Sequence, residues 1–163
     1  NHDFKSTNTA VSLYMALKEQ EAGNVLVLNG DVFFGEKVVE GILALEGQTV
    51  AAVQRHDLSD EEVKVMVQDG QVTQIGKYLD DDKAYGEAFG VYLLSAKFAT
   101  YLKRELLLLN NPRVFYEAGM DRLLMGGHPM SMFDVEDQIV QEIDFPDDYQ
   151  ELLRIAGIQD GLD

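Results

Sequence analysis

The clearest apolar run in this chain is Val25–Leu28, whose four consecutive aliphatic residues lead directly into Asn-Gly-Asp at positions 29 to 31. An uninterrupted run of this kind is typical of a strand covered on both faces, as in a parallel sheet with helices on either side. In such sheets, ligands gather at the carboxyl ends of the strands. We therefore expect Asp31 to stand at a ligand-binding edge as a ligand for a hard metal ion. Gly30, which has no side chain, would leave room for a phosphate or a sugar.

Hydrophobic residues at helical spacing and at strand spacing alternate through the first half of the chain. Possible caps at Ser6–Thr9 precede a periodic run that ends at Gly23, which predicts a first helix. A second helix is predicted over Glu36–Glu46 and a covered strand over Thr49–Val53. Val63, Val65 and Val67 then occupy every second position before Asp69-Gly70, and Val72 and Ile75 follow it, which predicts a hairpin between residues 62 and 77.

The second half continues the same pattern. Asp80–Asp82 reads as a solvated acidic loop, and Ala88–Leu94 as a strand in which Gly90 marks a bulge or a close backbone approach. Further elements are predicted by periodicity, and Pro146 suits the first turn of the last helix. They are helices over Ala96–Leu109 and Tyr116–Met125, strands near Ser131–Val135 and Ile139–Ile143, and a helix from Pro146 to about Ala156. This alternation indicates an α/β fold in a single domain, 1–163.

Composition and charge narrow the possible partners. Apolar residues make up 46% of the chain, which suits a packed core, and the formal net charge is −16. Nucleic-acid backbones need clustered basic side chains, so we expect no nucleic-acid partner. A divalent cation can nevertheless bridge carboxylates to the phosphates of a small molecule.

Three features that the sequence lacks exclude other classes of protein and partner. No stretch approaches the ~20 apolar residues of a membrane span, so no membrane partner is expected. The first residues lack the layout of a secretory signal, which makes the cytoplasm the expected location. Cysteine is absent, which excludes disulfides and thiolate metal sites.

A second acidic site resembles the first. Asp144 follows a short apolar strand and precedes Phe145-Pro146-Asp147-Asp148, so its carboxylate is expected to face the same cleft as Asp31. Two such carboxylates, with phosphate oxygens and waters, suit an octahedral Mg²⁺ site. The alternative is that Asp144 caps the last helix. Arg55 and His56, after the strand that ends at Val53, suit either phosphate binding or local charge balance.

Several short segments occur in a characteristic order. They are Asn29-Gly30-Asp31-Val32, Lys64 through Gly76-Lys77, Gly86-Glu87 with Gly90-Val91-Tyr92, Tyr116-Glu117, and Glu142-Ile143-Asp144-Phe145-Pro146-Asp147-Asp148. Together they resemble the sugar-nucleotide and choline-phosphate type of nucleotidyltransferases, and most of all the small cytidylyltransferases. The resemblance implies a Rossmann-like nucleotidyltransferase sandwich with a mixed sheet.

The resemblance also implies a reaction and a set of roles. An acceptor phosphate or phosphonate oxygen would attack the α-phosphorus of a nucleoside triphosphate, such as CTP, and release pyrophosphate. Asp31 and Asp144 match two magnesium-ligating, catalytic aspartates. Lys77 matches a lysine near the acceptor or product phosphate, and Glu87 matches an acidic residue of the acceptor pocket. From the residues alone, Lys77 and Glu87 also suit solvated surface charges, and Tyr116 and Glu117 suit packing and helix-dipole roles.

The family's glycine-rich triphosphate loop has no counterpart in this chain. By the resemblance, the chain is the C-terminal two-thirds of such a domain, with a sheet incomplete on its N-terminal side. The strand Val25–Leu28 would then be an exposed edge, so we expect a homodimer or a partner chain to cover it and the isolated chain to be inactive.

Two other interpretations remain open. The chain could be a non-catalytic binding or assembly domain that keeps the fold without the triphosphate loop. It could also be a phosphatase with Asp31 as nucleophile, although Phe33 occupies the position where such enzymes usually carry a second acid.

Overall fold

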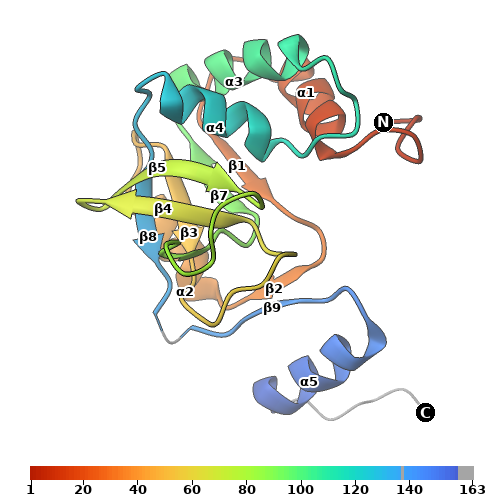
Figure 1. Cartoon of the computed structure of the whole chain (residues 1–163), viewed down its shortest axis with the longest axis vertical. Coiled ribbons are helices and arrows are strands. Elements are labelled where there is room, and N and C mark those ends of the chain that lie inside the picture. Colours follow the sequence, from red (N-terminus) through yellow and green to blue (C-terminus); the bar gives the residue numbers. More distant parts are fainter. Residues whose placement is uncertain (137, 158–163) are drawn as a thin grey trace.

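The computed structural model describes residues 1–136 and 138–157, which form a mixed sheet with helices on both faces (Figure 1). A seven-stranded sheet has the order β1-β7-β3-β8-β5-β4-β6, and a separate two-stranded ribbon joins β2 to β9. The helices are α1 (Thr9–Glu19), α2 (Glu36–Leu43), α3 (Ala96–Leu108), α4 (Glu117–Met125) and α5 (Pro146–Ala156). The strands are β1 (Val25–Leu28), β2 (Val32–Phe34), β3 (Val50–Val53), β4 (Lys64–Gln68), β5 (Gln71–Gly76), β6 (Gly86–Glu87), β7 (Val91–Leu94), β8 (Ser131–Asp134) and β9 (Val140–Glu142).

The sheet is mostly antiparallel. Among the described strands, β3 and β8 form the one parallel pair, and β1 pairs antiparallel with β7. The prediction of a parallel sheet around Val25–Leu28 is therefore wrong, whereas both faces of the strand are covered as predicted, since Val27 packs in one core and Leu26 packs against the other. Within the described residues β1 is an edge strand, and Leu28 is 45% exposed. A short apolar run specifies a strand, but not which neighbours it pairs with.

The side chains of β3 alternate between two cores. Ala51 and Val53 pack on the face covered by α1, α3 and α4, whereas Val50 and Ala52 pack on the face covered by α2. All four are completely buried, since a strand that is central in the sheet presents alternate residues to opposite faces. Figure 1 shows the three helices on one side of the sheet.

The predicted elements are present with small changes at their ends. The hairpin turns at Asp69 and Gly70, whose φ angles are 52° and 75°. The strand predicted over Ala88–Leu94 begins instead at Val91, because Gly90 adopts φ 83° and interrupts the extended backbone. Gly90 thus has the special backbone geometry that its position in the sequence predicts.

The acidic loop after β5 is not simply solvated. The loop is exposed as predicted, but Asp81 Oδ1 also lies 2.7 Å from the Nζ of Lys64, whose side chain is 1% exposed. The same Nζ donates to the carbonyl of Lys77 over 3.1 Å. The loop therefore neutralises the buried cation of Lys64, and Lys64 in turn fixes the backbone at Lys77.

None of the described helices is long and apolar enough to cross a membrane.

Candidate functional site

The ribbon of β2 and β9 brings the two predicted acidic turns together. Val32 lies opposite Glu142 in the ribbon, and the backbone N–H of Ile143 donates to the carbonyl of Asp31 over 2.8 Å. Asp31 and Asp144 therefore flank the same ribbon end, and both line one cavity of about 260 Å³. We call it the acidic cavity.

Asp144 is free of the capping role that its position also suits. The carboxylate of Asp148 accepts hydrogen bonds from the backbone N–H groups of Asp144 (3.0 Å) and Phe145 (2.8 Å). The residue at the N-cap is Phe145, with Pro146 at the first helical position. Since Asp148 satisfies the start of α5, the exposed carboxylate of Asp144 can serve the cavity.

The acidic cavity collects far more negative than positive charge. Burial, together with the nearby carboxylates of Glu87, Asp144 and Asp31, raises the pKa of Glu142 to about 7. Carboxylates crowded in this way favour protonation or a bound cation. The charged side chains that line the cavity are Asp31, Glu61, Glu87, Glu117, Glu142, Asp144 and Lys77.

A hard divalent cation fits this donor set. Asp31 and Asp144 are exposed oxygen donors, and Mg²⁺ usually takes one or two carboxylates while keeping waters and substrate phosphates as its other ligands. Across the described residues, no three His, Cys, Asp or Glu side chains are arranged as a complete metal-binding group. A cation held here would thus depend on ligands from solvent and substrate.

Gly30 and Asn29 shape the floor of the cavity. A Cβ built on Gly30 would meet nothing within 4 Å, so the space beside it is open. The backbone N–H of Asn29 donates to the carbonyl of Gly90 over 2.9 Å, and its Oδ1 accepts from the hydroxyl of Tyr116 over 2.8 Å. These bonds hold the Asn-Gly-Asp turn against β7 and α4.

Lys77 is the one basic side chain among those that line the acidic cavity in the described structure. Its Nζ lies 3.4 Å from Glu61 Oε2 and 5.1 Å from the ring centroid of Phe115. The buried Lys64 fixes its backbone through the carbonyl described above. Lys77 is therefore a positioned cation at the cavity, where it could pair with a phosphate.

Glu87 lies deeper and is 7% exposed. Its backbone is held between β4 and Gln54, with bonds of 2.9 and 2.8 Å to Gln54. Its Oε2 lies 2.8 Å from Nε2 of His56. Burial raises the pKa of Glu87, and the hydrogen bond from His56 opposes that rise.

Tyr116 and Glu117 stand at the start of α4, as the sequence suggests. Both also line the acidic cavity. Glu117 is 5% exposed, and its Oε2 is buried with no hydrogen-bond partner among the described residues. Burial raises its pKa to about 7. Nothing in the local sequence predicts this orphaned oxygen, because it results from packing of α4 against the sheet.

Glu142 is a site residue that sequence reasoning misses. It stands two positions before Asp144, and residues i and i+2 of extended chain lie on one face. Strand alternation could therefore have placed it beside Asp144.

Arg55 and His56 do not act as a pair. Arg55 Nε lies 3.2 Å from Asp134, and its guanidinium stacks over Tyr85 at 5.1 Å from the ring centroid. Arg55 thus balances local acidity, whereas His56 contacts Glu87. The two basic side chains therefore contact different acidic residues, Arg55 contacting Asp134 and His56 contacting Glu87.

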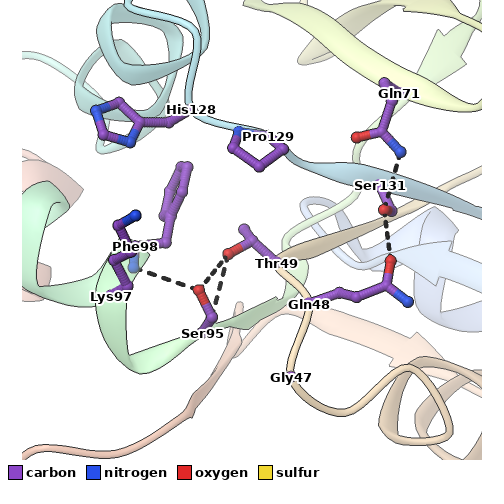
Figure 2. Close-up of a pocket in the computed structure, with 10 residues that line it drawn as sticks. All are labelled: Gly47, Gln48, Thr49, Gln71, Ser95, Lys97, Phe98, His128, Pro129 and Ser131. Atoms are coloured by element: carbon purple, nitrogen blue, oxygen red, sulfur yellow. Dashed lines mark hydrogen bonds between the residues drawn. The ribbon is translucent and has the colours of Figure 1, made fainter.

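Three of the described cavities are larger than the acidic cavity, and one of them, of about 350 Å³, shares Glu87 and Glu142 with it. An apolar cavity of about 480 Å³ between β5 and α4 shares Lys77, Phe115 and Glu117 with the acidic cavity. Another, of about 430 Å³, contains polar groups that hydrogen-bond to each other, including Thr49 with Ser95 at 2.9 Å (Figure 2). The apolar cavity adjoins the candidate site, whereas the cavity in Figure 2 shares no lining residue with it.

The fold and the acidic cavity together define a mixed α/β protein with a carboxylate-rich site beside a two-stranded ribbon. Comparison with known proteins assigns the fold. The inositol-1-phosphate CTP transferase from T. maritima has a TM-score of 0.75 at 18% identity, over 100% of this chain and 66% of that one. The CTP:phosphocholine cytidylyltransferase from Streptococcus pneumoniae has a TM-score of 0.77 at 17% identity, over 96% and 67%. A UDP-glucose pyrophosphorylase from Acinetobacter baumannii has a TM-score of 0.70 at 14% identity, over 92% and 56%.

This chain therefore has the Rossmann-like nucleotidyltransferase fold, as the sequence motifs predict. It spans about two-thirds of the length of the first two of these structures. No family model matches the sequence, and no curated protein matches it.

Proposed function

We propose that this chain forms the metal- and acceptor-binding part of a magnesium-dependent nucleotidyltransferase. The observation that carries the proposal is the convergence of Asp31 and Asp144 on one cavity that also contains Lys77 and Glu87. These are the residues that the family motifs bring together.

The reaction would join an acceptor phosphate or phosphonate oxygen to the α-phosphorus of a nucleoside triphosphate while the bond to pyrophosphate breaks. Such a transfer depends mainly on positioning and charge neutralisation. Asp31 and Asp144 would hold Mg²⁺, which supplies neutralisation of phosphate charge when bound. Lys77 would pair with the acceptor phosphate, Gly30 would leave room for it, and Glu87 would contact the rest of the acceptor.

Cytidylyl transfer from CTP is the form of the reaction that we propose. It is supported by two of the similar structures, a CTP transferase for inositol-1-phosphate and a CTP:phosphocholine cytidylyltransferase. Phosphocholine, a phosphonate or a sugar phosphate would be the acceptor, and its organic part would extend into the adjoining apolar cavity. We further propose a cytoplasmic location and a second copy or partner chain over the β1 edge.

Metal binding tests the central part of the proposal. Mn²⁺, used as a paramagnetic substitute for Mg²⁺, should bind the wild-type chain in the presence of CTP and be displaced by Mg²⁺. Asp31→Asn should reduce this affinity at least tenfold, whereas Asp82→Asn, in an exposed loop, should not. Equal binding in wild type and Asp31→Asn would contradict the assignment.

Turnover tests the reaction. We expect pyrophosphate release with CTP, Mg²⁺ and phosphocholine when this chain is assayed together with the second copy or partner chain that covers β1. Light scattering reports whether such a second chain is present. An absence of both metal-dependent CTP binding and pyrophosphate release would favour a non-catalytic assembly domain.

A further inference from the structure

His56 and Glu87 form a contact that the family motifs do not include. The imidazole Nε2 lies 2.8 Å from Glu87 Oε2, and Nδ1 lies 2.9 Å from the carbonyl of Asp57. The His56 side chain is 34% exposed, and that of Glu87 is 9% exposed. A solvent-accessible imidazole is therefore bound to a carboxylate that is almost completely buried.

The hydrogen-bond chemistry restricts the protonation of this pair. A carbonyl oxygen only accepts hydrogen bonds, so Nδ1 of His56 must carry a hydrogen. Nε2 then either donates to a charged Glu87 as imidazolium or accepts from a protonated Glu87. In both forms one proton lies between the two side chains.

The surroundings favour the charged form of the pair. Burial lowers the pKa of His56, but the hydrogen bonds to Glu87 and to the Asp57 carbonyl raise it more, and its net shift is upward. Glu62 lines the cavity on the His56 side of Glu87, Glu142 lines the cavities on both sides, and Lys77 lines the acidic cavity. An imidazolium is stabilised by these carboxylates, whereas a second buried carboxylate without a cation would become protonated.

Glu87 separates two cavities. One is the acidic cavity, and the other, of about 350 Å³, is lined by His56, Glu62 and Gln54. Glu87 lines both cavities. His56 lines the second cavity but not the acidic cavity. Only Oε2 of Glu87 makes a side-chain hydrogen bond to a described residue, so Oε1 is available to a ligand.

Building on the proposed function, we propose that His56 is a positioning residue that holds Glu87 as a charged hydrogen-bond acceptor for the acceptor substrate. An acceptor matched to Glu87 carries, besides its phosphate, an N–H or O–H donor. A protonated Glu87, with its Oε2–H donating to His56, would present Oε1 only as a neutral acceptor, which binds an N–H or O–H donor less strongly than a charged carboxylate does.

Ligand binding in three variants tests this inference. The probes are O-phosphoethanolamine, whose ammonium donates hydrogen bonds, and phosphocholine, whose quaternary nitrogen does not. By calorimetry with Mg²⁺, His56→Ala and Glu87→Gln should weaken O-phosphoethanolamine binding about tenfold, the scale of a hydrogen bond to a charged group. Phosphocholine binding should change less than about threefold, since no donor is lost. His56→Gln retains an N–H donor and should restore part of the affinity.

The matched control is His128→Ala, which changes a histidine in the cavity of Figure 2 and should leave both affinities unchanged. Nitrogen-15 NMR of the histidine rings provides a second readout. The wild type should show a protonated Nδ1 at His56, and the pKa of His56 should fall in Glu87→Gln.

Three results would overturn the inference. They are a His56 pKa unchanged in Glu87→Gln, O-phosphoethanolamine affinity unchanged in His56→Ala, and no binding of O-phosphoethanolamine to the wild type. The proposed function is judged separately by Mn²⁺ binding and by pyrophosphate release with phosphocholine. Turnover with phosphocholine alone would keep the function and reject the role of His56.

Discussion

The backbone N–H of Ile143 donates a 2.8 Å hydrogen bond to the carbonyl of Asp31, which ties two segments from opposite halves of the chain. The bond extends the pairing of β2 with β9 and sets Asp31 beside the residue that precedes Asp144. Two acidic turns that are distant in sequence thereby share one cavity.

Asp144 and Asp148 should separate metal binding from helix capping. Asp144→Ala should remove Mn²⁺ binding with little change in unfolding free energy, since its exposed carboxylate makes no cap. Asp148→Ala should lower the unfolding free energy by about 1 kcal/mol through loss of its two capping bonds. Chemical denaturation measures the unfolding free energy of each variant, and Mn²⁺ titration measures its metal affinity. A larger stability loss in Asp144→Ala than in Asp148→Ala would show that the roles are reversed.

Gly90→Ala should destabilise the chain by two effects. A Cβ at Gly90 would lie 2.2 Å from Cγ of Asn29, and the backbone φ is 83°. Gly70→Ala is the matched control, because its φ is 75° and a Cβ there meets nothing within 4 Å. The control should cost about 1 kcal/mol for backbone strain, and Gly90→Ala should cost at least about 1 kcal/mol more. Equal losses in denaturant unfolding would mean that Asn29 moves aside freely.

Glu117 should make stability depend on pH. Its pKa is raised from 4.5 to about 7 by burial, so the folded state binds this proton more tightly than the unfolded state. Its contribution is therefore complete below pH 4.5 and is lost as pH rises through about 7. This loss is about 3 kcal/mol.

The variant Glu117→Gln should remove that share of the pH dependence. Unfolding free energies from pH 4.5 to 8 should fall less steeply in the variant than in the wild type, and the exposed Glu46→Gln should behave as wild type. Parallel curves for wild type and Glu117→Gln would refute a raised pKa at this position.

The ion pair between Lys64 and Asp81 should stabilise the fold. Removing one partner of a buried pair leaves an uncompensated charge, here on Lys64, which is 1% exposed. Because Asp81 is partly exposed, we expect Asp81→Asn to cost about 1–3 kcal/mol, at or below the range for fully buried pairs. Asp82→Asn, in the same loop, should change stability by less than about 0.5 kcal/mol. Thermal unfolding of both variants measures the difference, and equal melting temperatures would show that solvent replaces Asp81.

Local patterns in the sequence determined most of the elements. The Asp69-Gly70 turn, the alternation of Val63 to Val67, and the start of α5 at Pro146 each depend on neighbouring residues, so they can be recognised from the sequence alone. The motif order also predicted the nucleotidyltransferase fold, which the similar structures confirm. The metal at Asp31 and Asp144 and the roles of Lys77 and Glu87 stay predictions.

Tertiary structure decided the pairing and the environment of each group. The antiparallel pairing of β1 with β7, the burial of Lys64 against Asp81, the contact of His56 with Glu87 and the orphaned oxygen of Glu117 all arise between segments far apart in sequence. Hydrophobic periodicity shows which side of an element faces the interior, but it carries no information about which distant element packs there. Charge state and hydrogen bonding at the cavity depend on that packing, because burial and neighbouring charges, rather than residue type, set a buried group's pKa.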